Sequence, residues 1–283
     1  MVKYIINADD LGLSPAVNQA IDKYLSEGLI SSSTIMANTR YWSEVEAICA
    51  KHPEASFGVH LNLTQGPSMT NSPILHRYGL TDDNGYFVHI EKDNIKFTDE
   101  LVKAIQEEWQ MQIQTVFNHQ IPISHLDGHH HVHAWFELET VLIRLCHEFK
   151  VKRVRNRYTV PFSEREKVTL PSTRTTSRKK QNGVAIKRQS ILSRIFTSLK
   201  LRLESSLWRW RLSLSGIHTT DYFHYYESIY NMLKSGGRFP SNCTVELMSH
   251  PGHEKFIEEN KLIEDRGVTT LSEGTLISYN QLK

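Results

Sequence analysis

Histidines concentrated in one short stretch are the residues best suited to carry chemistry. Five of the 15 histidines lie within residues 125–133, and the stretch from Asp127 to His133 reads DGHHHVH. Neutral imidazole is the commonest protein ligand for transition metals, and imidazole beside carboxylate suits a hydrolytic metal centre. The leading hypothesis is therefore a metal-dependent enzyme. A histidine tract taken alone could also be a solvated patch or an adventitious metal site.

Two more polar groups follow apolar runs that resemble strands. Asp9 and Asp10 come after the apolar run Tyr4–Asn7, and His60 lies near the end of the expected strand Ala55–Leu63. Functional groups gather at the carboxyl ends of parallel strands, so these residues could converge with the histidine stretch. The alternatives are a capping role for Asp10 and a satisfied core position for His60.

His250 is a fourth candidate, placed between an expected strand and a rigid turn. It follows the run Thr244–Met248 and precedes Pro251 and Gly252. A histidine held in this way suits a general acid that protonates a leaving group. The alternative is an ordinary polar turn residue.

Short apolar runs alternate with longer amphipathic stretches along the chain. The expected strands are Tyr4–Asn7, Ser33–Met36, Ala55–Leu63, Ile121–Leu126, Val151–Val154 and Thr244–Met248. The expected helices are Ala16–Glu27 behind a Ser14-Pro15 start, Tyr41–Lys51, Asp99–His119, Ala134–Phe149 and Glu254–Asp265. This rhythm predicts an α/β protein with a mostly parallel sheet, either open or closed into a barrel.

One basic segment interrupts the rhythm. Residues 174–211 contain eleven Lys or Arg and a single acid, Glu204. Apolar residues recur there at helical spacing: Ile191, Ile195, Leu199, Leu203, Leu207 and Trp210. The pattern predicts a basic helical insertion at about residues 170–217. It could bind nucleic acid or an anionic membrane surface. We favour instead a solvated helix whose apolar stripe packs on the body, forms a lid or contacts a second subunit in a homodimer, and we expect no nucleic-acid partner.

Bulk composition fits one enzyme-sized domain. The chain has 283 residues, is 39% hydrophobic and carries a net charge of +2, so we expect a single barrel-sized domain over residues 1–283. Three cysteines without a CxxC pair predict neither a disulfide framework nor a zinc ribbon. No secretory signal or membrane-spanning run is expected, which together favour a cytoplasmic protein.

Five motifs occur in an order that resembles a known family. They are NADDLG at 7–12, SSST at 31–34, GVHLNLT at 58–64, SHLDGHHHVH at 124–133 and SHPG at 249–252. Together they resemble the YdjC-like carbohydrate deacetylases, the family that includes chitooligosaccharide deacetylase. That family is similar to the larger group of metal-dependent polysaccharide deacetylases.

The resemblance implies a distorted (β/α) TIM-like barrel and a hydrolase that removes N-acetyl groups from chito-oligosaccharide-like sugars, releasing acetate. It implies that Asp10, His60 and His129 ligate one divalent metal ion, that Asp9 is the general base and that His250 is the general acid. Mg²⁺ is the ion that the family implies. Two imidazole ligands favour a softer ion, so Zn²⁺ is the main rival.

The remaining candidates would orient the ligands or bind substrate. They are His125, Asp127, His131 and His133 of the histidine stretch, and Arg155, which lies in a segment that matches the family only loosely. Surplus histidines beside Asp127 leave open a different enzyme, a phosphoesterase with two metals bridged by carboxylate. Such an enzyme would bind two ions per chain, whereas the deacetylase would bind one.

Overall fold

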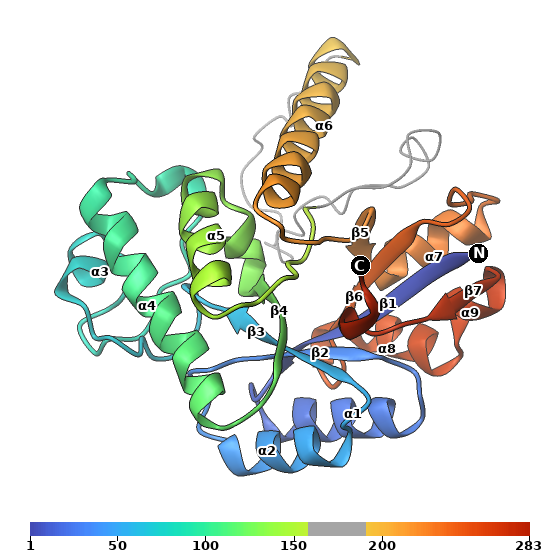
Figure 1. Cartoon of the computed structure of the whole chain (residues 1–283), viewed down its shortest axis with the longest axis horizontal. Helices are drawn as coiled ribbons and strands as arrows, with labels where there is room; N and C mark the ends of the chain where they lie inside the picture. Colours follow the sequence, from blue (N-terminus) through green and yellow to red (C-terminus); the bar gives the residue numbers. More distant parts are fainter. Residues whose placement is uncertain (158–190) are drawn as a thin grey trace, which may run out of the picture.

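The computed structural model of the chain describes residues 1–157 and 191–283, apart from the side chains of 191–202. The first part of the basic segment predicted from the sequence, residues 170–190, therefore lies outside the described residues. Its C-terminal part forms a helix, α6, that projects from the body (Figure 1).

A parallel sheet forms the centre of the molecule, with the strand order β4-β3-β2-β1-β6-β5 and with β7 paired to β1. The strands are β1 Val2–Leu11, β2 Ser32–Ile35, β3 Ser56–Leu61, β4 Ile123–Gly128, β5 Tyr222–Tyr225, β6 Thr244–Ser249 and β7 Gly274–Leu276. Every pairing between these strands is parallel, as the alternation of strand and helix predicted. The sequence did not predict β5 and β7, because each run is too short to show an alternation of apolar and polar residues.

Isolated bridges continue the sheet beyond β4. Leu126 bridges Val154, and Arg153 bridges His218, four residues before β5 begins. The sheet therefore runs from β4 through these segments toward β5, which confirms the predicted distorted barrel. The prediction of a regular strand at Val151–Val154 is wrong, because this segment forms only one isolated bridge with each of its two neighbouring segments.

Helices flank the sheet (Figure 1), and the sequence predicted all of the described ones except α3, α7 and α9. They are α1 Pro15–Ser26, α2 Trp42–Lys51, α3 Pro73–Arg77, α4 Asp99–Asn118, α5 Glu139–Glu148, α6 Ile191–Leu214, α7 Tyr226–Lys234, α8 Ile257–Glu264 and α9 Gly267–Leu271. Ser14 caps α1 by accepting from the backbone N–H of Val17, and Pro15 fills the first turn.

The helix expected from Ala134 begins later than predicted. Residues His129–Ala134 form a 3₁₀ turn in which His130 and His131 have left-handed backbone angles, with φ of 51° and 58°. A second 3₁₀ turn, Phe136–Leu138, follows, so α5 starts only at Glu139. The histidine stretch is therefore held in a tight, irregular turn at the end of β4.

β1 runs further than the sequence predicted, and the paired aspartates lie inside it. The pairing of β1 with β2 shifts register between Ala8 and Leu11, and Asp10 has a φ of 71°. Such a bulge disturbs the strict alternation of side chains along a strand and re-aims them. The bulge therefore allows the side chains of Asp9 and Asp10, although adjacent in the strand, to face the same region of the protein.

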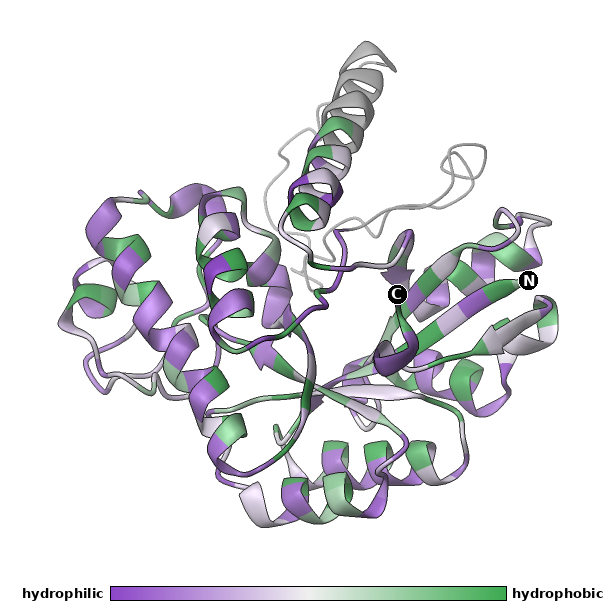
Figure 2. Cartoon of the chain, in the orientation of Figure 1, coloured by the Kyte–Doolittle hydropathy of each residue, from purple (hydrophilic) through white to green (hydrophobic). Residues whose placement is uncertain are grey.

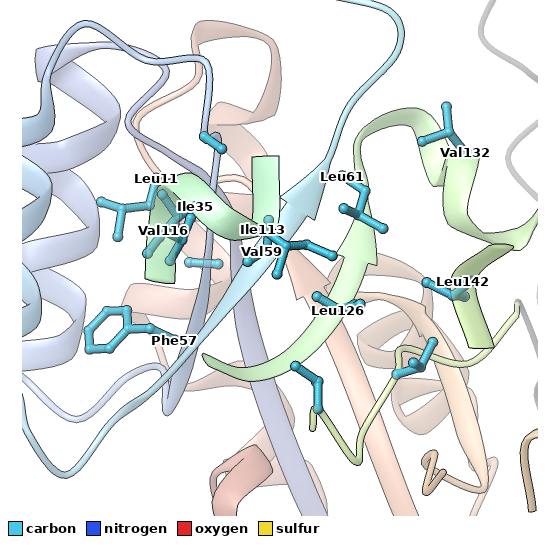
Figure 3. Close-up of a cluster of buried hydrophobic side chains, with 14 of the residues drawn as sticks. Leu11, Ile35, Phe57, Val59, Leu61, Ile113, Val116, Leu126, Val132 and Leu142 are labelled. Atoms are coloured by element: carbon cyan, nitrogen blue, oxygen red, sulfur yellow. The ribbon is translucent and has the colours of Figure 1, made fainter. Parts of the chain in front are cut away.

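The hydrophobic core lies between the sheet and the helices, whose apolar faces turn toward it (Figure 2). In one part of it, Val59 of β3 and Leu126 of β4 lie with Ile113 and Val116 of α4 (Figure 3). Among the described residues, no helix is both long and apolar enough to cross a membrane. Cys49, Cys146 and Cys243 are free thiols.

Two substitutions on α4 test this packing. Ile113 is fully buried, and Ile113→Ala should lower the free energy of unfolding by about 2–5 kcal/mol, since it removes core contacts and leaves a cavity. Met111, two residues away, is 44% exposed, and Met111→Ala should change it by less than about 0.5 kcal/mol. Urea unfolding of both variants measures the difference. Equal losses would contradict this orientation of α4.

Candidate metal centre

Three predicted ligands from separate parts of the barrel meet at one point. His129 Nδ1 lies 2.9 Å from Asp10 Oδ1, and His60 Nε2 lies 3.3 Å from the same oxygen. One ligand atom from each residue falls within 4.8 Å of the others, and all three side chains are buried. β1, β3 and the turn after β4 therefore bring together residues that lie more than a hundred positions apart.

The donor set fits a divalent cation. Asp10 Oδ1 is buried and makes no well-aligned hydrogen bond, although two imidazole nitrogens face it. Burial alone would raise the pKa of Asp10, but His129, His253 and His60 hold it well below its usual range. A carboxylate with two imidazoles could hold Mg²⁺, Mn²⁺, Co²⁺ or Zn²⁺, and three protein ligands leave positions open.

Asp127 fixes the orientation of His60. Its Oδ1 lies 2.7 Å from His60 Nδ1, and Thr34 Oγ1 donates to its Oδ2 over 3.0 Å. Carboxylates commonly hold metal-binding histidines in this way, leaving the other ring nitrogen for the ion. Burial alone would lower the pKa of His60, but Asp127 and the nearby carboxylates of Asp10 and Asp9 raise it to about 10.

Two side chains that were not assigned a role also touch the ligands. Gln65 Oε1 lies 2.9 Å from His129 Nε2, and His253 Nε2 lies 3.1 Å from Asp10 Oδ2. His253 follows His250 by three residues in the turn after β6. This second histidine so close to the first was the only indication in the sequence that His253 has a role. Nothing in the sequence around Gln65 indicated its contact, which depends on the fold.

Asp9 is held beside the centre by a two-point ion pair. Arg155 donates from Nη2 to Asp9 Oδ1 over 2.6 Å and from Nη1 to Oδ2 over 2.8 Å. Asn7 Nδ2 donates to Oδ1 over 2.9 Å, and His60 Nε2 lies 3.9 Å from Oδ2. Burial would raise the pKa of Asp9, but Arg155 lowers it well below its usual range. Asp9 is therefore ionised.

Arg155 itself is fully buried among three carboxyl groups. Besides Asp9, its Nη1 lies 2.9 Å from Asp127 Oδ2, and its Nε donates to Glu246 Oε1 over 2.7 Å. Tyr279 OH donates to the other oxygen of Glu246. Burial raises the pKa of Glu246 to about 7, against the opposing effect of Arg155. Arg155 was expected to orient the ligands or to bind substrate, and the structure places it among the carboxyl groups of Asp9, Asp127 and Glu246. Glu246 is an acid within the otherwise apolar strand β6, and that exception to the strand pattern was its signal in the sequence.

His250 is positioned by the helix that follows it. Its backbone N–H donates to Glu259 Oε1 over 2.8 Å, and its Nδ1 lies 3.3 Å from the same oxygen. Its ring stacks on Phe256, with centroids 4.0 Å apart. Burial would lower the pKa of His250, but Glu259 raises it above its ordinary value. His250 therefore carries more positive charge at neutral pH than a free histidine.

The other predicted histidines do not belong to the group of three potential ligands. His125 stacks on Tyr279 with centroids 3.6 Å apart, beside the Arg155 network. His131 and His133 line a cavity of about 190 Å³, whose other lining residues are Ala134, Trp135, Asn156, Arg157, Ser205 and Phe223. Burial and then Arg155 hold the pKa values of all three histidines well below the ordinary value, so they are neutral.

Known proteins resemble both the fold and the sequence. A crystal structure from Enterococcus faecalis V583 of a suggested cellobiose-phosphate cleavage protein matches with a TM-score of 0.65 and 21% identity, covering 98% of this chain and 97% of that one. At that identity the likeness concerns the fold alone.

Several relatives are carbohydrate deacetylases by name. The one from Brevibacillus brevis is 32% identical over 171 residues, 59% of this chain and 63% of the relative. The one from Oceanobacillus iheyensis is 33% identical over 150 residues, 52% of this chain and 61% of the relative. The matches thus span less than two thirds of the relatives' length. The family of YdjC-like proteins, by contrast, matches residues 3–273. The chain therefore belongs to the YdjC-like protein family.

Proposed function

We propose that this protein is a metal-dependent deacetylase that hydrolyses the N-acetyl groups of chito-oligosaccharide-like sugars. The observation that carries the proposal is the meeting of Asp10, His60 and His129 directly beside the ionised carboxylate of Asp9. The names of the related deacetylases support the same reaction.

Asp9 is the proposed general base. A divalent ion bound by Asp10, His60 and His129 would supply a Lewis acid for the acyl carbonyl and for water. Arg155 and Asn7 hold Asp9 in one orientation and in its ionised form, so its carboxylate is available to accept a proton from the attacking water.

His250 is the proposed general acid. Glu259 favours its imidazolium form, and stacking on Phe256 fixes the plane of the ring. As the amide C–N bond breaks, the proton of His250 would pass to the departing nitrogen. Because the water has already added to the carbonyl carbon by then, its oxygen leaves in acetate, and the sugar retains a free amine.

The cavity beside the centre supports a sugar substrate. His131 and His133 belong to the same turn as His129, and Trp135 and Phe223 add aromatic rings to the cavity wall. Aromatic faces suit the apolar faces of sugar rings. We propose Mg²⁺ as the resident ion on the family resemblance, with Zn²⁺ as the rival that two imidazoles favour.

The contacts of Arg155 favour one ion over the two of a phosphoesterase. A second group of potential ligands, Asp9, His60 and Asp127, shares His60 with the first. The guanidinium of Arg155 already lies within 2.9 Å of both carboxylates in that group. A fixed cation therefore takes the place that a second metal ion would need.

Replacing the proposed base should abolish most activity. Asp9→Asn should lower kcat by roughly 10²–10⁴-fold, because the amide cannot accept the proton. Acetate release from N-acetylated chito-oligosaccharides by metal-loaded protein measures it, and calorimetry should show that the variant still binds the ion. Asp83→Asn, at an exposed carboxylate, is the control and should retain activity. Full activity of Asp9→Asn would remove its role, and a wild-type protein releasing no acetate would contradict the proposed function.

Removing the partner of His60 should weaken metal binding. Asp127→Asn should raise the Kd for the ion by about 10–100-fold, because His60 loses its orienting carboxylate. Asp22→Asn is the matched control, since Asp22 pairs with His52 over the same 2.7 Å but outside the proposed ligand set. Titration of chelator-treated protein with Mg²⁺ and Zn²⁺ gives the affinity and should give one ion per chain. Unchanged affinity in Asp127→Asn, or two ions per chain, would count against the proposed centre.

A further inference from the structure

Residues 277–282 cross the starts of three neighbouring strands. Ser31, which precedes β2, donates from Oγ to the backbone carbonyl of Ile277 over 2.7 Å. Ser56, the first residue of β3, accepts at Oγ from the backbone N–H of Tyr279 over 3.0 Å. The backbone N–H of Ile277 donates to a carbonyl near the start of β1. The proposed ligands on β1 and β3 lie at the carboxyl ends of those strands, so this segment packs at the end of the barrel away from the site.

Apolar packing accounts for most of this segment. Ile277, Tyr279 and Leu282 form a small buried cluster with Ile5 of β1, separate from the main core. A capping box fixes the turn that carries Tyr279. A phenylalanine at position 279 would fill nearly the same space, so packing does not explain the tyrosine hydroxyl.

The hydroxyl of Tyr279 joins a chain of hydrogen bonds that ends at Asp9. It donates to Glu246 Oε2, and Glu246 Oε1 accepts from Arg155 Nε over 2.7 Å. Arg155 in turn donates to both carboxylate oxygens of Asp9. All four side chains are buried. The chain therefore connects the far end of the barrel to the proposed base.

The ring of Tyr279 is fixed in place beside Glu246. It stacks on His125 of β4, with centroids 3.6 Å apart and ring planes 9° apart. A buried tyrosine hydroxyl needs a hydrogen-bond partner, and a buried carboxylate oxygen needs a donor. The hydroxyl and Glu246 therefore hold each other in position.

The same hydrogen bond favours the charged form of Glu246. Burial raises the pKa of Glu246 to about 7, and Asp127 acts in the same direction, whereas Arg155 and Tyr279 oppose both. Loss of the hydroxyl would leave a larger share of Glu246 neutral at pH 7. A neutral carboxyl group holds a guanidinium less firmly than a carboxylate does.

We propose that Tyr279 is a positioning residue of the active site, acting through Glu246 and Arg155 on the carboxylate of Asp9. Without its hydroxyl, Glu246 can turn away from Arg155, and the guanidinium that orients Asp9 gains freedom. The segment at one end of the barrel thus contributes to the chemistry at the other. The inference rests on the proposed role of Asp9 as general base.

Tyr279→Phe tests the proposal, because it keeps the stacked ring and removes only the hydroxyl. It should lower kcat for acetate release from N-acetylated chito-oligosaccharides on the order of tenfold, the effect of one hydrogen bond to a charged group. KM should stay unchanged, because the loss concerns the base and not contacts with the substrate. An unchanged kcat would overturn the proposal.

Tyr4→Phe is the matched control. Tyr4 is also fully buried, and its hydroxyl bonds to Ser272 outside this network. Each variant loses one buried hydrogen bond, so the two melting temperatures should fall by a similar amount, while Tyr4→Phe keeps the wild-type kcat. An equal loss of kcat in Tyr4→Phe would assign the effect to stability and contradict a positioning role.

A double-mutant cycle tests the route through Glu246. Glu246→Gln should lower kcat by itself, and adding Tyr279→Phe should lower it little further, since the hydroxyl acts through the charge of Glu246. Independent, multiplying losses would show that Tyr279 does not act through Glu246.

The NMR resonance of the Arg155 Nε–H group reports the same contact without turnover. Tyr279→Phe should shift this resonance, whereas Tyr4→Phe should leave it in place. A wild type that releases no acetate would contradict the proposed function, and the resonance would still decide whether Tyr279 acts on Arg155. A resonance that Tyr279→Phe does not move would overturn the inference whatever the activity.

Discussion

The guanidinium of Arg155 is the interaction on which the rest of the site depends. It is fully buried and contacts Asp9, Asp127 and Glu246. Burying an unpaired charge costs several kcal/mol, so neither the arginine nor these carboxylates is stable there alone. One planar cation thereby sets the orientation of the proposed base and, through Asp127, of the proposed ligand His60. A single side chain therefore couples the position of the proposed base to the position of the proposed metal ion.

Charge balance explains why such a centre would bind a cation. Asp9, Asp127 and Glu246 surround one guanidinium, and burial raises the pKa of Glu246 to about 7. Asp10 is the carboxylate that Arg155 does not neutralise, and it is ringed instead by imidazoles. A divalent ion at Asp10 would compensate the remaining negative charge. The electrostatics thus favour an ion at the Asp10 group and disfavour one at Asp9 and Asp127.

The sequence predicted the regular strands and helices better than the bulges and irregular turns of the backbone. Strand and helix periodicity predicted the parallel sheet, and the motifs located Asp10, His60 and His129, because each lies at the end of a strong apolar run. The bulge at Asp9–Asp10 and the left-handed turn at His130 were not predicted, since both oppose local backbone preference and depend on tertiary contacts. These two irregular segments carry the proposed base and two of the proposed ligands.

Contacts between residues far apart in the sequence were the second feature that could not be predicted from the sequence. Glu259 beside His250, Gln65 beside His129 and Tyr279 beside Glu246 are polar residues that no local pattern distinguishes. Their roles follow from which strand ends the barrel brings together. The same limit applies to α6. The helical spacing of its apolar residues predicted a stripe along the helix, but not whether that stripe faces the body or the outside. Because the buried face of that helix consists of Trp208 and Leu212, the described members of the predicted stripe lie on the outer surface of the helix.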